Sequence, residues 1–246
     1  MKENTIIIGR QPLIEAIRSG RAIEKIFFHR HVSGESIGDI RRLAKENNIP
    51  IQSVPPEKLA AITRGNHQGV LAFASLVEYM GLQQVIDFVV AEGKVPLFLM
   101  LDGITDIRNI GAMSRTALCC GAQSIIIPDK GVASLNEEAL KASAGALETI
   151  HICRVGSLLK AIDSLHLNGI RVYTSEPRAS KQISELDFKE PSCIVMGSEG
   201  RGVQAHISKA VDDHFRIPMP GGFDSLNVSV ATGIILYEAM KQRLLA

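Results

Sequence analysis

Short apolar runs alternate along the first third of the chain with segments whose apolar residues recur at helical spacing. This pattern predicts strands at residues 25–29, 49–54 and 70–76 and helices at residues 12–19, 36–47 and 56–63. Pro56 would lie in the first turn of its helix, where a missing backbone N–H carries no penalty. These segments predict a small α/β unit that ends near residue 79.

The alternation restarts at residue 82 and continues to the end of the chain. Helices are expected at 82–91, 109–120, 136–144, 156–167, 204–210 and 227–245, and strands at 97–101, 124–128, 150–153, 170–174, 192–196 and 214–217. Regular strand–helix alternation implies a mainly parallel sheet that is covered on both faces. We therefore expect an α/β protein with two domains, residues 1–79 and 80–246.

Composition and charge narrow the class of protein. Of 246 residues, 46% are hydrophobic and 22% charged, as in an ordinary globular protein. The net charge of +1 indicates no overall affinity for nucleic acid, and the low aromatic content of 4%, without tryptophan, argues against base-stacking platforms. No apolar run reaches the length of a membrane span or signal peptide. We expect a cytoplasmic protein that has no membrane partner.

The four cysteines are Cys119, Cys120, Cys153 and Cys193. None belongs to a Cys-x-x-Cys pair, and each lies in an apolar segment. They are predicted to be small buried hydrophobic residues in a reducing compartment, and neither a disulfide nor a metal site is expected.

Polar residues follow three of the predicted strands. The first group lies between residues 101 and 121, where a buried strand ends at Asp102 and a polar loop leads to Asn109, a candidate helix N-cap. Arg115 lies six residues further on. Taken alone, the two residues read as a helix cap and a surface charge. Alternatively, they place an amide and a guanidinium at the carboxyl end of a parallel sheet, where α/β proteins bind ligands.

The second group is the glycine-rich segment IVMGSEGRGV at residues 194–203. Its spacing is not G-x-G-x-x-G and no long helix follows it directly, which disfavours a dinucleotide site and an oxidoreductase. Gly197, at the end of the predicted strand, permits close backbone approach. Glu199 is either a direct participant in a site or a carboxylate that caps the neighbouring helix.

The third group joins the last strand to the last helix at residues 217–237. Ile217 and Met219 continue an alternating strand pattern, prolines and glycines from 218 to 222 interrupt regular structure, and Ser225 and Asn227 flank Leu226 at the helix start. Either polar residue is a candidate N-cap. Free N–H groups at this helix start would suit an anion or a polar cofactor, although ordinary strand–loop–helix corners share the pattern.

Together these groups resemble the SpoU (TrmH) class of the SPOUT superfamily, the ribose 2′-O-methyltransferases of tRNA and rRNA. The resemblance lies in NIGAMSR at 109–115, MGSEGRGV at 196–203 and IPMPGGFDSLNVSVATGIILYE at 217–238. NHQGV at 66–70 is similar to the end of a small substrate-binding domain, related to RNA-binding ribosomal proteins, in bacterial large-subunit rRNA guanosine methyltransferases. Relatives often carry proline where this chain has Ile107.

The resemblance implies an α/β-knot catalytic domain that contains a trefoil knot, binds S-adenosylmethionine and forms a homodimer through the last helix. The implied cofactor contacts are Gly197, Ile217 and Leu226, with Met219 close by. Arg115 would be central to catalysis. Asn109 would position the loop or the substrate, Glu199 would order the site, and Ser225 and Asn227 would shape the junction. No metal is implied.

The expected activity is 2′-O-methylation of RNA, with a guanosine of large-subunit (23S) rRNA favoured over tRNA. The alternatives are a tRNA 2′-O-methyltransferase and a non-catalytic RNA-binding or ribosome-assembly factor with the same fold. The five polar motif residues together favour the enzyme. Candidate phosphate contacts in the first domain are Arg10, Arg18, Arg21, Lys25, Arg30, Arg41 and Arg42.

Overall fold

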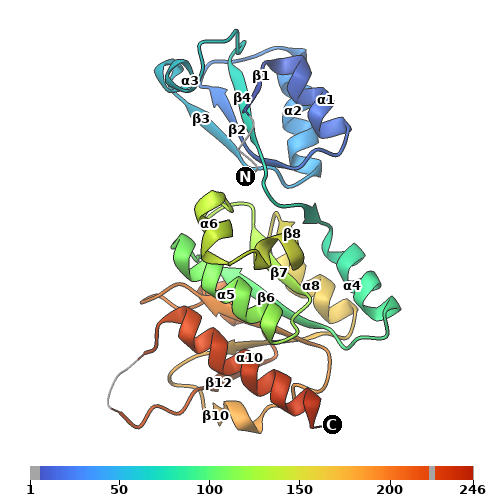
Figure 1. The fold of residues 1–246 in the computed structure, drawn as a ribbon, viewed down its shortest axis with the longest axis vertical. Helices are drawn as coiled ribbons and strands as arrows, with labels where there is room; N and C mark the ends of the chain where they lie inside the picture. Colours follow the sequence, from blue (N-terminus) through green and yellow to red (C-terminus); the bar gives the residue numbers. More distant parts are fainter. Residues whose placement is uncertain (1–5, 222–224, 246) are drawn as a thin grey trace. The chain divides into compact units, whose positions relative to one another are not determined.

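The computed structural model describes residues 6–221 and 225–245, so Gly222 in the expected cofactor loop lies outside the described residues. The chain forms two units, drawn in Figure 1. Unit 1 comprises Met1–Glu78 with Ser134–Glu137, and unit 2 comprises Tyr79–Ala133 with Glu138–Ala246. Each unit has its own sheet.

Unit 1 is a four-stranded mixed sheet with the strand order β1-β4-β2-β3. Its elements are β1 (Ile6–Ile8), α1 (Arg10–Arg18), β2 (Ile23–His29), α2 (Glu35–Glu46), β3 (Ile51–Val54), α3 (Pro56–Ile62) and β4 (Val70–Ala74). Strands β2 and β3 are parallel, whereas β4 runs antiparallel to β1 and β2. Leu13, Phe28 and Ile40 pack between the sheet and helices α1 and α2. Leu59 of α3 packs on the opposite side with Phe27 and Leu71.

Unit 2 is an eight-stranded sheet with the order β10-β12-β9-β11-β6-β7-β8-β5. Its elements are β5 (Tyr79–Met80), α4 (Leu82–Ala91), β6 (Leu97–Asp102), α5 (Ile107–Cys119), β7 (Ser124–Pro128), α6 (Glu137–Ala142), α7 (Ala146–Thr149), β8 (His151–Val155), α8 (Leu158–Leu167), β9 (Arg171–Ser175), β10 (Lys181–Gln182), the 3₁₀ helix η1 (Ile183–Glu185), β11 (Ser192–Gly197), α9 (Ala205–Ser208), β12 (Asp213–Arg216) and α10 (Val228–Leu244). Neighbouring strands pair in parallel. The α/β fold with a mainly parallel sheet is confirmed.

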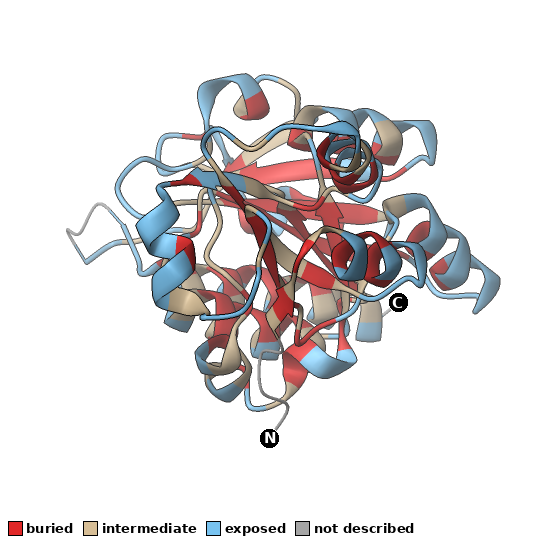
Figure 2. Cartoon of the chain, turned by 90° about the horizontal axis from the view of Figure 1, so that it is seen from above, coloured by how far each residue is buried: buried red, intermediate tan, exposed pale blue. Residues whose placement is uncertain are grey.

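Helices cover both faces of this sheet, which explains why its central strands are mostly apolar. All six residues of β6 are buried. Phe98 and Met100 pack in one core with α4 and α8, and alternate residues of a strand point to the other face, where α5 and α10 lie against each other. Figure 2 shows the strands in the buried class and the outer helix faces exposed. In the sequence, a strand that is buried on both faces is a nearly continuous run of apolar residues.

Several predicted boundaries are wrong for local physical reasons. The helix expected at 109–120 begins at Ile107, because the side chain of Asp106 accepts the backbone N–H of Arg108 and caps the helix instead of Asn109. The helix expected at 136–144 ends at Ala142, and Ala144, inside the expected range, has a left-handed φ of 49°. The strand expected to reach Ile217 ends at Arg216.

The expectation that all four cysteines are buried is wrong for Cys119, which is exposed at the end of α5, and for Cys120, which is only half-buried. Cys153 and Cys193 are buried, and burial raises the pKa of the Cys153 thiol to about 11. All four are free thiols.

The end of α10 is attached to two distant segments of unit 2. Arg243 donates to the carbonyl oxygens of Val95 at 2.6 Å, Pro96 at 2.8 Å, Phe188 at 2.8 Å and Glu190 at 3.0 Å. Gln242 accepts the backbone N–H of Phe188 at 2.9 Å. The final helix is therefore held at its end by side-chain hydrogen bonds as well as by apolar packing.

Replacing Arg243 tests this attachment. Arg243→Ala leaves four carbonyl oxygens without their charged donor, so the free energy of unfolding is expected to fall by about 2 kcal/mol in urea denaturation. The matched control is Lys241→Ala on the same helix, which removes only the exposed ion pair with Glu238 and is expected to change stability by less than about 0.5 kcal/mol. Equal effects of the two variants would contradict the proposed attachment.

Candidate active site at the carboxyl ends of the parallel strands

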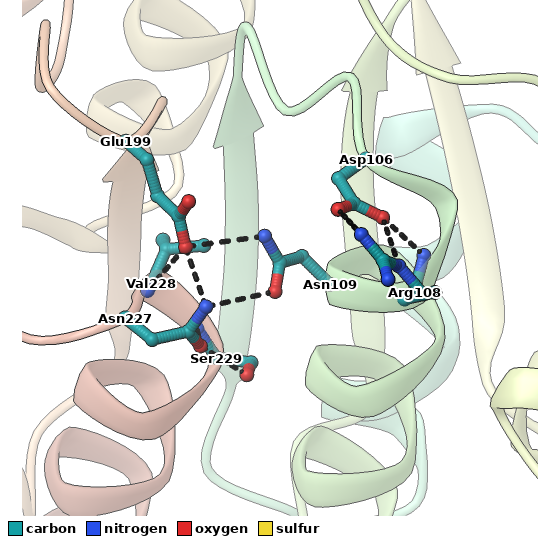
Figure 3. Close-up of polar contacts among 7 residues, drawn as sticks. All are labelled: Asp106, Arg108, Asn109, Glu199, Asn227, Val228 and Ser229. Carbon is teal, nitrogen blue, oxygen red and sulfur yellow. Dashed lines mark hydrogen bonds and ion pairs between the residues drawn. The ribbon is translucent and has the colours of Figure 1, made fainter.

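One carboxylate oxygen joins three segments that are far apart in the sequence. Asn109 in the first turn of α5 donates from Nδ2 to Oε1 of Glu199 at 3.3 Å, although 90 residues separate them. Asn227 donates from Nδ2 to the same oxygen and to Oδ1 of Asn109, the latter at 3.2 Å. Figure 3 shows this cluster from α5, the loop after β11 and the start of α10. The fold thus brings three of the expected catalytic residues into direct contact.

The start of α10 is capped from two sides. Asn227 accepts the backbone N–H groups of Ser229 at 2.9 Å and Val230 at 3.3 Å. Glu199 accepts the N–H of Val228 at 3.4 Å. Asn227, and not Ser225, is therefore the N-cap. The first N–H groups of α10 are already paired, so of the two alternatives for this helix start the structure favours the ordinary strand–loop–helix corner over an open anion site.

Gly197 is required because the loop after β11 folds back onto the end of its own strand. A Cβ at Gly197 would lie 2.0 Å from the carbonyl carbon of Gly202 and 2.1 Å from the backbone nitrogen of Val203. The loop closes through a hydrogen bond of 2.9 Å from Gly202 N to the carbonyl oxygen of Ser198. Gly200 has a left-handed φ of 81°. These demands explain why the glycines do not follow the dinucleotide-binding spacing.

Asp102 holds the other end of this loop, at Gln204, and we call residues 198–204 the glycine loop. Its side chain is buried, with 2% of the residue exposed. Oδ2 accepts the backbone N–H of Gln204 at 2.7 Å, and Oδ1 accepts the side-chain amide of the same residue at 2.5 Å. Sequence reasoning identified Asp102 only as the end of a strand. A charged residue that closes a fully apolar strand was the signal for a buried, paired carboxylate.

The loop before Asn109 carries its own ion pair. Arg108 donates from Nη2 to Oδ2 of Asp106 at 2.8 Å and from Nε to Oδ1 at 3.2 Å. These hydrogen bonds from Arg108 hold the pKa of the Asp106 carboxyl below its ordinary value. Asp106 therefore remains ionised where it caps α5, and Ile107, the next residue, is where the chain departs from the family pattern.

Arg115 is not part of the polar cluster. Six residues of α-helix correspond to about 9 Å of rise and roughly 600° of rotation, which turns Arg115 away from Asn109. Its side chain is exposed, and among the described residues it makes no hydrogen bond or ion pair. The guanidinium is therefore available to a ligand that reaches the outer face of α5.

The remaining predicted residues lie on the loop between β12 and α10. Ile217 and Met219 are half-buried beyond the end of β12, and Ser225 and Leu226 are exposed just before α10. The structure brings neither pair into the polar cluster. They provide accessible apolar and hydroxyl groups on the loop that follows β12, a strand separated from β11 by β9 in the sheet.

The described part of the chain contains neither a cluster of metal ligands nor a membrane-spanning helix. Residues 6–221 and 225–245 contain no group of three or more histidine, cysteine, aspartate or glutamate side chains suited to a metal ion. Across the same residues, every helix is too short or too polar to cross a bilayer.

Comparison with known proteins assigns both units. Residues 96–237 match the model of the SpoU rRNA Methylase family, and residues 6–80 match the model described as RNA 2′-O ribose methyltransferase substrate binding. The chain is 36% identical to a protein of Staphylococcus saprophyticus named for the TrmH family of tRNA/rRNA methyltransferases. That alignment covers 98% of this chain and 97% of the relative.

Solved structures share the fold. The SpoU methyltransferase AviRb from Streptomyces viridochromogenes, in complex with AdoMet, superposes with a TM-score of 0.63 at 22% identity and covers 99% of this chain and 92% of its own. The TrmH/SpoU tRNA modifying enzyme of A. aeolicus superposes with a TM-score of 0.55 at 26% identity. It covers 67% of this chain and 85% of its own.

Replacing Gly197 tests the geometry of the glycine loop. Gly197→Ala places a Cβ against backbone atoms that have no room to yield, so the protein is expected to lose about 1–3 kcal/mol of stability in thermal or urea unfolding. The matched control is Gly38→Ala in α2, where nothing lies within 4 Å of an added Cβ. The control is expected to be neutral or stabilising by up to about 1 kcal/mol. A Gly197→Ala protein as stable as the control would rule out the close approach.

Proposed function

The chain belongs to the SpoU rRNA methylase (TrmH) family, and from that premise we propose that it transfers a methyl group from S-adenosylmethionine to the 2′-hydroxyl of an RNA ribose. The observation that carries the proposal is the hydrogen-bonded cluster of Asn109, Glu199 and Asn227. It unites the three segments that resemble the family motifs at the carboxyl edge of one parallel sheet, where α/β proteins bind ligands. The polar side chains are not scattered surface groups.

The residues of the loop between β12 and α10, together with Gly197, suit the cofactor. Ile217, Met219 and Leu226 offer apolar surface to an adenosyl group, and Gly197 allows the backbone of its loop to approach closely. The carboxylate of Glu199 lies at the positive end of α10 and offsets that partial charge. This compensation matters because bound S-adenosylmethionine supplies an electrophilic methyl carbon on a cationic sulfonium.

Arg115 is proposed to act on the RNA and not as a base. A guanidinium stays protonated in proteins, so it cannot accept the ribose hydroxyl proton. Its forked donors match the phosphate next to the reacting ribose and stabilise the alkoxide as it develops. The proton leaves to a phosphate oxygen or a water molecule. The cluster of Asn109, Glu199 and Asn227 positions α5, which carries Arg115, against the loop between β12 and α10. Ser225 shapes the junction beside Asn227.

The proposed substrate is a guanosine of large-subunit (23S) rRNA, with tRNA as the alternative. Support comes from residues 6–80, which match the substrate-binding model, and from the tRNA modifying enzyme of A. aeolicus, which covers only 67% of this chain. We assign residues 1–79 to RNA recognition and residues 80–246 to methyl transfer, in the cytoplasm. Mapping ribose methylation across total RNA from cells with and without the gene tests the substrate. Calorimetry with S-adenosylmethionine tests the non-catalytic alternative.

We also propose a homodimer through α10. Val230, Ile234 and Tyr237 are 51%, 39% and 57% exposed, and their spacing of four and three residues places them on one stripe of the helix. Such a stripe is available for a second copy of the chain, whose matching surface would complete the active site. The trefoil knot that the family resemblance implies belongs to the same proposal.

Substitution of Arg115 tests its proposed role. Arg115→Lys keeps the charge but loses the fork, so kcat is expected to fall roughly 10-fold or more, while the Kd for S-adenosylmethionine, measured by calorimetry, stays the same. The matched control is Arg171→Lys, an exposed arginine at the amino end of β9 and therefore at the opposite edge of the sheet. Its kcat is expected to change less than about twofold. Wild-type kcat in Arg115→Lys would refute the forked-donor role.

A charged residue within the α10 stripe tests the homodimer. Ile234→Glu introduces a carboxylate that would be buried in the interface, so sedimentation is expected to show the monomer mass of 26.7 kDa in place of twice that value. The matched control is Leu167→Glu at the end of α8, a residue that is 88% exposed. This control should remain dimeric. A monomeric wild-type protein at micromolar concentration would contradict the proposal.

A further inference from the structure

Three loops of unit 1 meet at the carboxyl end of β2. They are Gly9–Arg10 at the start of α1, residues 29–34 after β2, and residues 64–69 before β4. His29 donates its backbone N–H to the carbonyl oxygen of Gly69 at 2.8 Å, and Arg10 donates from Nε to the carbonyl oxygen of Gln68 at 3.0 Å. A Cβ at Gly34 would lie 3.2 Å from Nη1 of Arg10, which places the start of α2 beside the same loops. The three loops therefore form one surface.

The charged and titratable side chains of this surface are all guanidinium or imidazole groups, and we name it the histidine–arginine surface. Its charged and titratable residues are Arg10, His29, Arg30, His31, Arg64 and His67, all half-buried or exposed, and they include three of the seven histidines in the chain. No aspartate or glutamate lies in these loops. The nearest acidic residues of the adjoining helices are Glu35 in α2 and Glu57 in α3.

The histidine rings are oriented as hydrogen-bond donors. Nδ1 of His67 accepts the backbone N–H of Gly69 at 3.0 Å, and Nδ1 of His29 accepts that of His31 at 3.4 Å. A neutral imidazole whose Nδ1 accepts must carry its proton on Nε2, so each ring keeps a donor even without a charge. Because these rings keep an Nε2–H, the surface combines guanidinium and imidazole donors, which suits an anion.

Two arginines of α2 in unit 1 already have partners. Arg42 pairs with Asp39 at 3.6 Å and Glu46 at 3.2 Å, and the guanidinium of Arg41 lies 4.8 Å from the centre of the Phe28 ring. By contrast, among the described residues the side chains of Arg30 and Arg64 make no hydrogen bond or ion pair. Arg30 and Arg64 therefore add two exposed guanidinium groups to the three histidines of this surface.

We propose that the histidine–arginine surface is where unit 1 binds the phosphate backbone of the RNA substrate. This inference rests on the proposed function and extends it to a particular face. Arginine and histidine donors bind phosphate oxygens, and a cationic surface with several such donors binds a polyanion through counterion release. The glycine caps of α1 and α2, which provide no side-chain acceptor, add the positive ends of two helices to the same side.

A triple variant of the full-length protein tests the surface. Arg30→Ala/His31→Ala/Arg64→Ala removes exposed groups only, so its melting temperature and its Kd for S-adenosylmethionine should equal those of the wild type. Its affinity for deproteinised large-subunit rRNA is expected to fall at least about 10-fold. The plot of log K against log salt concentration is expected to lose roughly two units of slope.

The matched control removes three exposed cationic residues from the other end of the unit, Arg18→Ala/Arg21→Ala/Lys45→Ala. Arg21 precedes β2 and Arg30 follows it, and seven strand residues separate them by about 23 Å. The control should bind rRNA within about twofold of the wild type. Arg30→Lys/Arg64→Lys, which retains the charge, should restore most of the affinity and the salt slope.

Wild-type rRNA affinity in the triple variant, or an equal loss in the control, would overturn the proposal. An acidic protein partner in place of RNA would give the same outcome, with rRNA binding unchanged. Binding and methylation are measured separately. If the wild type binds rRNA through this surface but transfers no methyl group, the proposed reaction fails while the surface assignment stands.

Discussion

The candidate active site depends on the carboxylate of Glu199. A single oxygen of that side chain accepts hydrogen bonds from Asn109, from Asn227 and from the backbone of Val228. These donors come from α5 and from the start of α10, so one negative charge fixes the relative positions of two helices and the loop after β11. Hydrogen bonds to a charged acceptor are stronger than neutral ones, and loss of the acceptor would leave all three donors without it.

The backbone of the glycine loop is also positioned by a small number of contacts. Gly197 allows the loop to pack directly on the end of β11. Asp102 accepts two hydrogen bonds from Gln204 and so holds the other end of the loop. Because both ends are anchored on adjacent parallel strands, Glu199 projects from a loop with little freedom. Preorganisation of this kind lets a site act by positioning, which suits methyl transfer because the proposed reaction needs alignment and needs no covalent participation by the protein.

The two units divide the proposed work according to their surfaces. Unit 2 presents a polar cluster and accessible apolar residues at the carboxyl edge of its sheet, as a small-molecule site requires. Unit 1 presents unpaired arginines and histidine donors, as a phosphate backbone requires. The net charge of +1 conceals this division, because only the clustering of basic residues on one face identifies a surface for nucleic acid.

Local patterns in the sequence determined the elements and the class of fold. The apolar runs at residues 97–101 and 124–128 predicted buried strands, and alternation with amphipathic segments predicted a parallel sheet. Ser225 and Asn227 were the two candidate caps of the last helix, and Asn227 is the cap. The residue types in the motifs also identified the chemistry to expect. These signals lie within a few residues of one another, so they can be recognised in the sequence without knowledge of the tertiary structure.

Only the tertiary structure decided which residues meet. Asp106 and Asn109 are both acceptable caps by local chemistry, and Asp106 took the cap while Asn109 paired with a glutamate 90 residues away. The partner of Asp102 lies 102 residues further along the chain. The first strand, Ile6–Ile8, was too short for a periodic signal and is defined by its pairing with β4. Such contacts depend on the order of strands in the sheet, because that order brings distant segments of the chain together. The local spacing of residues carries no information about this order.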